Sequence, residues 1–174
     1  MKAYIQNSRN LLGANLAGAL CWEGHHLTPS AAEAEVIFDT VTGFVYRDGR
    51  PLSRFVCGEM LGPGEDVSGS VIGYSILRFM RGGQLPRGEA GACVTDARDV
   101  ALAMMTAAER RIEGEFEVAG PFITLEDLAG ILAGSSQSRT SVAIPELDLT
   151  FRPVEETVND VVKWHRYGSS NLVA

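Results

Sequence analysis

Lysines, cysteines and long apolar runs are all scarce in this sequence of 174 residues. Lys2 and Lys163 are its only lysines, and 22 acidic residues against 15 basic ones give a net charge of −7. Because nucleic-acid phosphates bind concentrated positive charge, we expect no nucleic-acid partner. No apolar run approaches the roughly 20 residues that a membrane-spanning helix needs, so we expect no membrane partner either.

The cysteines and histidines are too few and too scattered to indicate a disulfide framework or a metal centre. Cys21, Cys57 and Cys93 are an odd number and lie far apart in the sequence. His25 and His26 have no cysteine or acidic partner at ligand spacing, so we predict no metal site. The N-terminus, MKAYIQNSRN, lacks the apolar stretch of a signal peptide. A reducing compartment, the cytoplasm, is therefore the expected location.

The remaining composition is that of a folded domain, with 45% hydrophobic residues. Apolar spacing predicts helices and strands that alternate along the chain, which indicates the α/β class. The predicted strands cover residues 3–5, 27–28, 35–46 (one or two strands), 55–60 and 116–118. The predicted helices cover residues 11–24, 70–81, 96–111, 124–133 and 154–166, with a turn at 47–51 and a loop at 134–140.

Five segments occur in the order of known motifs of one enzyme family. They are Lys2 to Gly13, Thr42-Gly43-Phe44-Val45-Tyr46, Met60-Leu61-Gly62-Pro63-Gly64, Val94 to Ala101, and Phe151 to Trp164. They resemble five motifs of the extended short-chain dehydrogenase/reductases. The first two segments resemble the first strand with its TGxxGxxG loop and the strand end that carries the catalytic Ser or Thr with Val-Tyr-Gly. The other three resemble, in order, the VYGPG motif, the V-x-D-V-A segment and the closing helix. The sequence is thus similar to the NAD(P)-dependent epimerase/dehydratase and dihydroflavonol-reductase-like group, in a strongly shortened form.

The resemblance implies a shortened Rossmann-like sheet of four or five strands, with helices on its faces and a small C-terminal part like a substrate lobe. We expect one compact unit over residues 1–174, with residues 1–64 as the nucleotide-binding-like part and 65–174 as the substrate-lobe-like part. Compared with the family, segments are missing between residues 30 and 35 and between residues 50 and 55. The second of these is where the family carries its catalytic Tyr-x-x-x-Lys helix.

The resemblance places the cofactor-binding loop at Asn7, Ser8, Arg9, Asn10, Leu11, Leu12 and Gly13. Asn7 and Asn10 stand where the family has glycines, and only Gly13 remains. Asparagine tolerates left-handed backbone angles, so the turn can persist, but its side chain intrudes where phosphates would lie. Arg9 is a candidate phosphate contact. We expect binding of NAD or NADP to be weak or lost; the alternative is a plain strand–helix loop with an N-capping asparagine.

The proton relay of the family is incomplete in this sequence. Thr42 matches the catalytic Ser/Thr position, whereas Tyr46 matches a tyrosine that is not the catalytic one. None of the four tyrosines is followed four residues later by a lysine, and an unperturbed phenol titrates near pH 10. Tyr74 and Arg78 share one face of a predicted helix. A semi-buried tyrosine beside a solvated arginine is the favoured interpretation of that pair.

Three functional hypotheses follow from these observations. The first is a truncated epimerase/dehydratase-like protein without the usual hydride transfer, which retains weak binding of a nucleotide or another small molecule. The second is a non-enzymatic module that self-associates into a homo-oligomer, because lost central strands would expose sheet edges. The third is an active oxidoreductase or epimerase with a non-standard relay built on Thr42, Tyr46 or Tyr74 together with an arginine.

Overall fold

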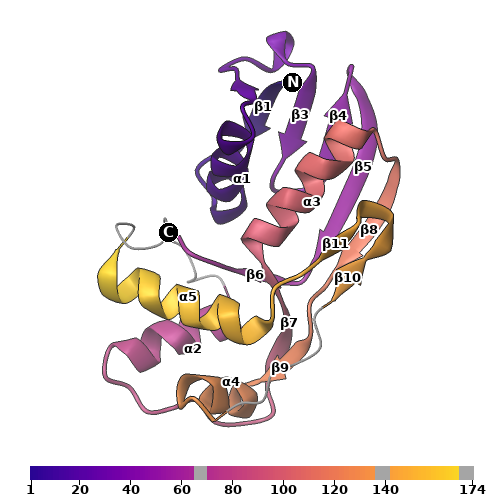
Figure 1. Ribbon diagram of the computed structural model, residues 1–174. Helices are drawn as coiled ribbons and strands as arrows, with labels where there is room; N and C mark the ends of the chain where they lie inside the picture. The colour runs from indigo at the N-terminus through magenta and orange to yellow at the C-terminus, as the bar shows by residue number, and fades with distance from the viewer. Residues whose placement is uncertain (65–69, 136–141, 169–174) are drawn as a thin grey trace. The chain divides into compact units, whose positions relative to one another are not determined.

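The computed structural model describes residues 1–64, 70–135 and 142–168, and the chain divides into two compact units (Figure 1). Unit 1 comprises Met1–Cys57, Ala97–Val118 and Ala143–Thr150, and unit 2 comprises Gly58–Asp96, Ala119–Val142 and Phe151–Ala174. The two units alternate along the chain, whereas the sequence suggested one division after residue 64. The difference arises because residues 97–118 return to the first sheet after the chain has entered unit 2.

Unit 1 is built on a mixed six-stranded sheet in the order β2-β1-β3-β4-β5-β8. Its strands are β1 (Lys2–Gln6), β2 (His26–Leu27), β3 (Val36–Asp39), β4 (Phe44–Arg47), β5 (Arg50–Cys57) and β8 (Gly114–Val118). Strand β1 is parallel to β2 and β3, β5 is parallel to β8, and β4 is antiparallel to both of its neighbours. The α/β class and the Rossmann-like parallel start are therefore confirmed.

The β3–β4–β5 meander explains why the sheet has six strands rather than the four or five expected. The run over residues 35–46 is two strands joined by a tight turn, and β5 already begins at Arg50, inside the expected turn at 47–51. Gly43 in the first turn has φ 75°. A Cβ at this position would lie 2.1 Å from the Phe55 carbonyl oxygen, so the close approach of the turn to β5 requires glycine.

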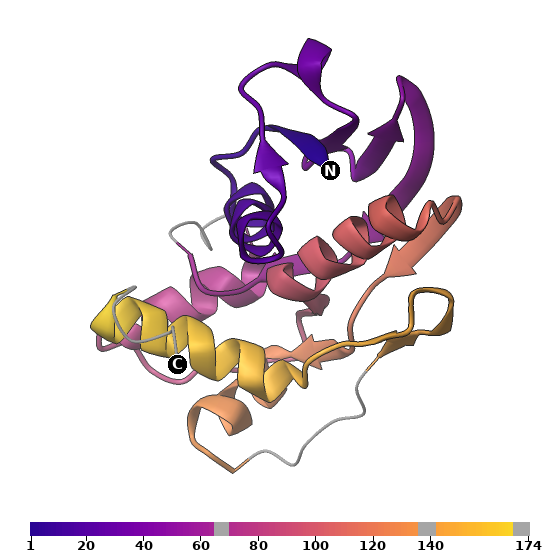
Figure 2. The same cartoon turned by 45° about the horizontal axis from the view of Figure 1, so that its top comes forward.

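Two helices, α1 (Leu11–Trp22) and α3 (Ala97–Arg110), pack side by side on the sheet of unit 1 (Figures 1 and 2). Leu12, Leu16 and Leu20 of α1 are buried, as their helical spacing predicts. The residues of α3 around Met104 are also buried, whereas Leu102 is 38% exposed. The smaller elements of unit 1 are η1 (Ala31–Glu33), β10 (Ala143–Ile144), η2 (Pro145–Leu147) and β11 (Leu149–Thr150).

Unit 2 has a three-stranded sheet in the order β6-β7-β9 and a core of its own. Its elements are β6 (Glu59–Leu61), α2 (Val71–Met80), β7 (Gly91–Asp96), β9 (Phe122–Thr124), α4 (Leu125–Leu132) and α5 (Val154–Tyr167). Thr124 begins α4 with a reciprocal capping box, in which the side chains of Thr124 and Asp127 each accept a backbone N–H. Among the described residues, no helix is long and apolar enough to cross a bilayer.

Candidate functional site

The loop from β1 to α1 has the backbone path that its asparagines were expected to permit. Asn7 follows β1 in the left-handed region, with φ 62°. Asn10 is the N-cap of α1, and its side-chain oxygen accepts the N–H of Gly13 at 2.7 Å. A Cβ at Gly13 would lie 2.7 Å from the Cα of Ser8, so this glycine lets the helix start lie against the loop. The expectation that asparagine tolerates this turn is confirmed at Asn7, and the N-capping asparagine of the alternative interpretation is present at Asn10.

The side chains of the predicted cofactor-binding residues have different surroundings. Asn7, Ser8 and Arg9 are exposed, whereas Leu12 is a core residue of unit 1. Leu11 is half-buried and opens the helix. A phosphate at this helix start would therefore meet backbone N–H groups and the exposed Arg9, while Leu12 fixes the helix to the sheet.

The turn between β3 and β4 is hydrogen-bonded directly to this loop. The Asn10 side-chain amide donates to Thr40 Oγ1 at 2.9 Å and to the Thr40 carbonyl at 3.4 Å. The Thr40 hydroxyl in turn donates to the carbonyl oxygens of Gln6 at 2.8 Å and Asn7 at 3.3 Å. Strands β1 and β3 are neighbours in the sheet, so both of their carboxyl ends meet at this point (Figure 1). The hydrogen bonds of Thr40 therefore join the turn after β3 to the β1–α1 loop.

A carboxylate lies beside the start of the same loop. Asp39 is 8% exposed and pairs in register with Gln6. Burial by itself would raise the pKa of the Asp39 carboxyl. Hydrogen bonds from the Thr42 side chain and from the N–H groups of Val41 and Thr42 outweigh burial and hold that pKa below its usual value. Asp39 is therefore ionised at neutral pH, and its negative charge opposes phosphate binding here.

Thr42, the predicted catalytic hydroxyl, lies in this turn, where its side chain hydrogen-bonds Asp39. The segment that follows Thr42 is the antiparallel strand β4, in which the rings of Tyr46 and Phe44 lie tilted to each other with centroids 5.7 Å apart. Lys2, at the opposite end of β1, forms an ion pair with Glu33 at 3.0 Å. No lysine in the described part of unit 1 lies near Thr42, because Lys2 is the only lysine there.

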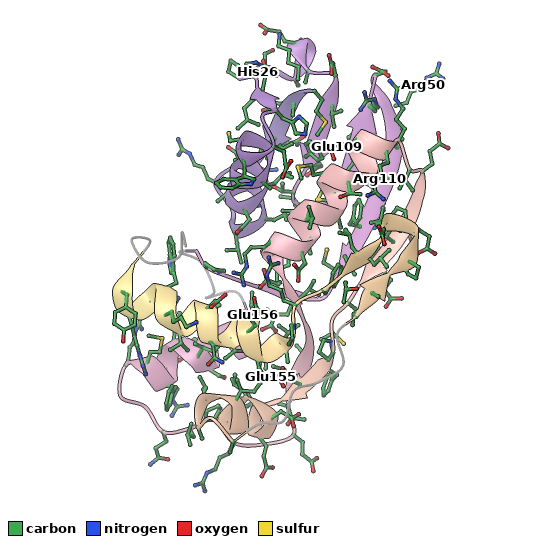
Figure 3. The ribbon with its side chains drawn as sticks, in the orientation of Figure 1. His26, Arg50, Glu109, Arg110, Glu155 and Glu156 are labelled. Atoms are coloured by element: carbon green, nitrogen blue, oxygen red, sulfur yellow. The ribbon has the colours of Figure 1, made fainter. Side chains whose placement is uncertain are left out.

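The histidines and acids do not assemble a metal centre in the described residues. His25 Nε2 lies 2.7 Å from Glu109 of α3, and its Nδ1 lies 3.2 Å from the terminal amine of Met1. Figure 3 labels Glu109 on α3 and His26, which is the first residue of β2. These contacts join the β2 end of unit 1 to α3, so His25 has a structural role.

Asp39 and Thr40 are the residues of this site that sequence reasoning missed. The run over residues 35–46 is rich in β-forming residues and reads as strand throughout. The available signal was Asp39 four residues before Gly43, because an aspartate that accepts the N–H groups two and three residues on begins a turn.

Comparisons with known proteins identify the fold. No protein-family model and no curated protein matches the sequence. Among solved structures, the Bordetella bronchiseptica enzyme WbmF in complex with NADH matches with a TM-score of 0.72 and 12% identity, over 95% of this chain and 91% of that chain. Thermotoga maritima UDP-glucose 4-epimerase with UDP-glucose matches with a TM-score of 0.66 and 12% identity, over 95% and 99%. Yeast methylglyoxal/isovaleraldehyde reductase complexed with NADPH matches with a TM-score of 0.64 and 10% identity, over 95% and 98%. The chain therefore has the same Rossmann-like fold as these solved epimerase and reductase structures.

Proposed function

We propose that this chain is a shortened NAD(P)-dependent epimerase/dehydratase-like protein that binds a nicotinamide dinucleotide weakly at the β1–α1 loop and does not transfer hydride. The observation that carries the proposal is the loop itself. Asn7 adopts the left-handed angle that usually needs glycine, and Gly13 keeps the helix start against the loop. The solved structures with this fold that contain NADH or NADPH add support for this ligand class.

Two features of the turn after β3 make the proposed binding weak. Thr40 is bonded across the loop, so an entering pyrophosphate competes with its contacts to Asn10 and Gln6. The Asp39 carboxylate adds repulsion, which weakens the binding of an anion several ångströms away by about 1 kcal/mol or more where water is partly excluded. We expect dissociation constants on the order of 1 mM, equivalent to about −4 kcal/mol. Neither NAD nor NADP is preferred on the residues at hand.

The proposed loss of hydride transfer rests on the missing cation beside a phenol. A tyrosine exchanges protons near neutral pH only when a neighbouring positive charge lowers its pKa. No tyrosine of the sequence has a lysine four residues later. Thr42 contacts Asp39, an acceptor that holds the hydroxyl in the turn. Because its pKa is held below the usual value, Asp39 is a weak base that stays unprotonated at neutral pH, so it is poorly suited to relay a proton for this hydroxyl.

Calorimetric titration with NADH and NADPH tests the binding. Arg9→Glu places a negative charge at the loop, and we expect it to lose about 1.5–3 kcal/mol of binding, or about 10- to 100-fold in affinity. Arg110→Glu is the matched control, because Arg110 is also exposed. Arg110 ends α3, which leads to the amino end of β8. It therefore lies at the end of the sheet opposite the β1–α1 loop. Saturable binding that both variants weaken equally, or no binding by the wild type at millimolar cofactor, would refute the proposal.

Turnover assays on ketones, aldehydes and nucleotide sugars test the proposed lack of hydride transfer. We expect no cofactor oxidation above background, and no change in the Thr42→Ala variant. Oxidation that Thr42→Ala abolishes would instead establish the alternative, an active enzyme with a non-standard relay.

Self-association is a second candidate function, favoured by the exposed apolar residues next to the α1–β2 connection. Trp22 is 84% exposed and Leu27 of the edge strand β2 is 42% exposed. A solvent-facing tryptophan is a common anchor of protein interfaces. If a homo-oligomer forms here, sedimentation of the wild type gives a mass above one chain and Trp22→Ser restores the monomer. A monomeric wild type at high concentration would remove this candidate.

A further inference from the structure

Unit 2 has a hollow of about 410 Å³ at the carboxyl end of α2, separate from the β1–α1 loop. Its lining is an aromatic ring, an aliphatic side chain, two guanidinium groups and a glycine pair. The residues are Tyr74, Leu77, Arg78, Arg81, Gly82 and Gly83. Helix α2 packs against α5 within this unit (Figures 1 and 2).

The two arginines are not needed to cap the helix end. Backbone N–H groups satisfy the last carbonyls of α2: Arg81 donates to Leu77, Gly82 to Phe79 and Gly83 to Arg78, each at 3.1 Å. Gly82 has φ 82°, and a Cβ at Gly83 would lie 2.4 Å from the Arg78 carbonyl oxygen. Because this glycine-dependent turn closes the helix, the guanidinium groups remain available for other contacts.

The positive charge of the hollow is not balanced by nearby acids. None of the residues that line it is acidic. Within the described parts of the chain, Arg78 and Arg81 form no ion pair. The charge of Arg81 also reaches His165 of α5, where burial and this cation together lower the pKa of the imidazole. In a protein with a net charge of −7, this hollow thus presents two arginines with no acid among its lining residues.

An aromatic surface adjoins this charge. The Tyr74 side chain was expected to be semi-buried, but it is 59% exposed. Tyr74 lies one helical turn before Arg78, so the ring and the guanidinium group are on the same side of α2. Leu77 supplies apolar contact in the same hollow. A guanidinium group binds phosphate or carboxylate through paired N–H donors, and a tyrosine ring stacks on a planar ring.

We propose that this hollow binds a small anion that carries a planar ring, with Arg78 and Arg81 on the phosphate or carboxylate and Tyr74 against the ring. The site requires neither the β1–α1 loop nor a hydride relay. Its test is therefore independent of the function proposed above.

Phenyl phosphate is the probe, and inorganic phosphate and phenol are the matched partial ligands. In calorimetric or NMR titrations, we expect Arg78→Gln and Arg81→Gln each to lower the affinity for phenyl phosphate about tenfold, since each removes a charge-assisted contact. Tyr74→Leu should lower the affinity for phenyl phosphate about threefold and leave the affinity for inorganic phosphate unchanged. Arg87→Gln, an exposed arginine that does not line the hollow, should change neither ligand.

Three results would overturn the assignment. They are no saturation of the wild type by phenyl phosphate up to roughly 50 mM, an equal loss in Arg87→Gln, and equal affinity for phenyl and inorganic phosphate. The third result would remove the ring from the proposed ligand and leave an anion site. Circular dichroism checks that each variant is folded, which we expect because the three substituted side chains of the hollow are exposed.

Discussion

The hydrogen bonds of Asn10 join the start of α1 to the turn after β3, and Asn10→Ala tests how much they contribute to stability. The substitution removes the N-cap acceptor of Gly13 N–H, which is worth about 1 kcal/mol. It also removes the donor to Thr40 Oγ1, worth about 1 kcal/mol for a half-buried hydrogen bond. The free energy of unfolding should therefore fall by about 2 kcal/mol, which corresponds to roughly 4–8 °C in Tm for a chain of this length.

Two further variants separate the parts of this loss. Asn10→Ser keeps an oxygen acceptor at the N-cap but loses the amide donor to Thr40, so we expect the free energy of unfolding to fall by about 1 kcal/mol. Asn15→Ala is the matched control on the same helix. The Asn15 amide only adds a second hydrogen bond to the Leu11 carbonyl, and alanine favours the helix, so the change should stay within about 0.5 kcal/mol. Urea denaturation followed by far-UV circular dichroism measures all three variants. A loss for Asn10→Ala no larger than for Asn15→Ala would refute the reasoning.

Three further predictions concern single groups. Because hydrogen bonds lower the pKa of Asp39 in the fold, its stabilising effect is present above its ordinary pKa of 3.8 and is lost as the pH falls through the folded value. Asp39→Asn should therefore destabilise the protein at pH 7, and urea titrations should show a stability that depends less on acid pH. The same variant should bind NADH more tightly. Arg81→Ala should raise the pKa of His165, measured by NMR of the imidazole, and an unchanged pKa would contradict the charge effect. Thr157→Val should lower the free energy of unfolding by about 1–3 kcal/mol, because the buried Thr157 hydroxyl donates to buried Asp96 at 2.8 Å. Thr157→Ser keeps the hydroxyl and should retain most of the stability.

Local signals in the sequence were sufficient for the helices and for the path of the β1–α1 loop. Asn10 is an N-cap residue three positions before Gly13, and the leucines of α1 have helical spacing, so the helix start could be read directly. The left-handed tolerance of Asn7 is also a property of a single residue type. Predictions of this kind depend only on residues within one or two turns of each other.

Strand pairing depends on distant residues, and it is the feature that sequence reasoning missed. The β-rich run over residues 35–46 contains no proline, so nothing except Asp39 and Gly43 marked the turn between β3 and β4. Strand β7 begins with Gly91, which has low strand propensity. The glycine is there because a Cβ would lie 2.1 Å from the Ile123 carbonyl oxygen of the neighbouring strand. That requirement is visible only once the pairing is known.

The antiparallel strand β4 and the turn at Asp39 and Thr40 have one structural origin. A parallel sheet needs a crossover of a dozen or more residues between neighbouring strands, whereas an antiparallel strand needs only a short turn. Here β4 follows β3 after four residues and runs antiparallel to it, and β5 then restores the parallel direction for β8. The turn that makes this possible must lie at the carboxyl end of β3, beside the end of β1. This is the edge at which parallel α/β sheets bind ligands. The turn therefore places Asp39 and Thr40 at this edge, where, in the proposed function, they are the groups that weaken cofactor binding.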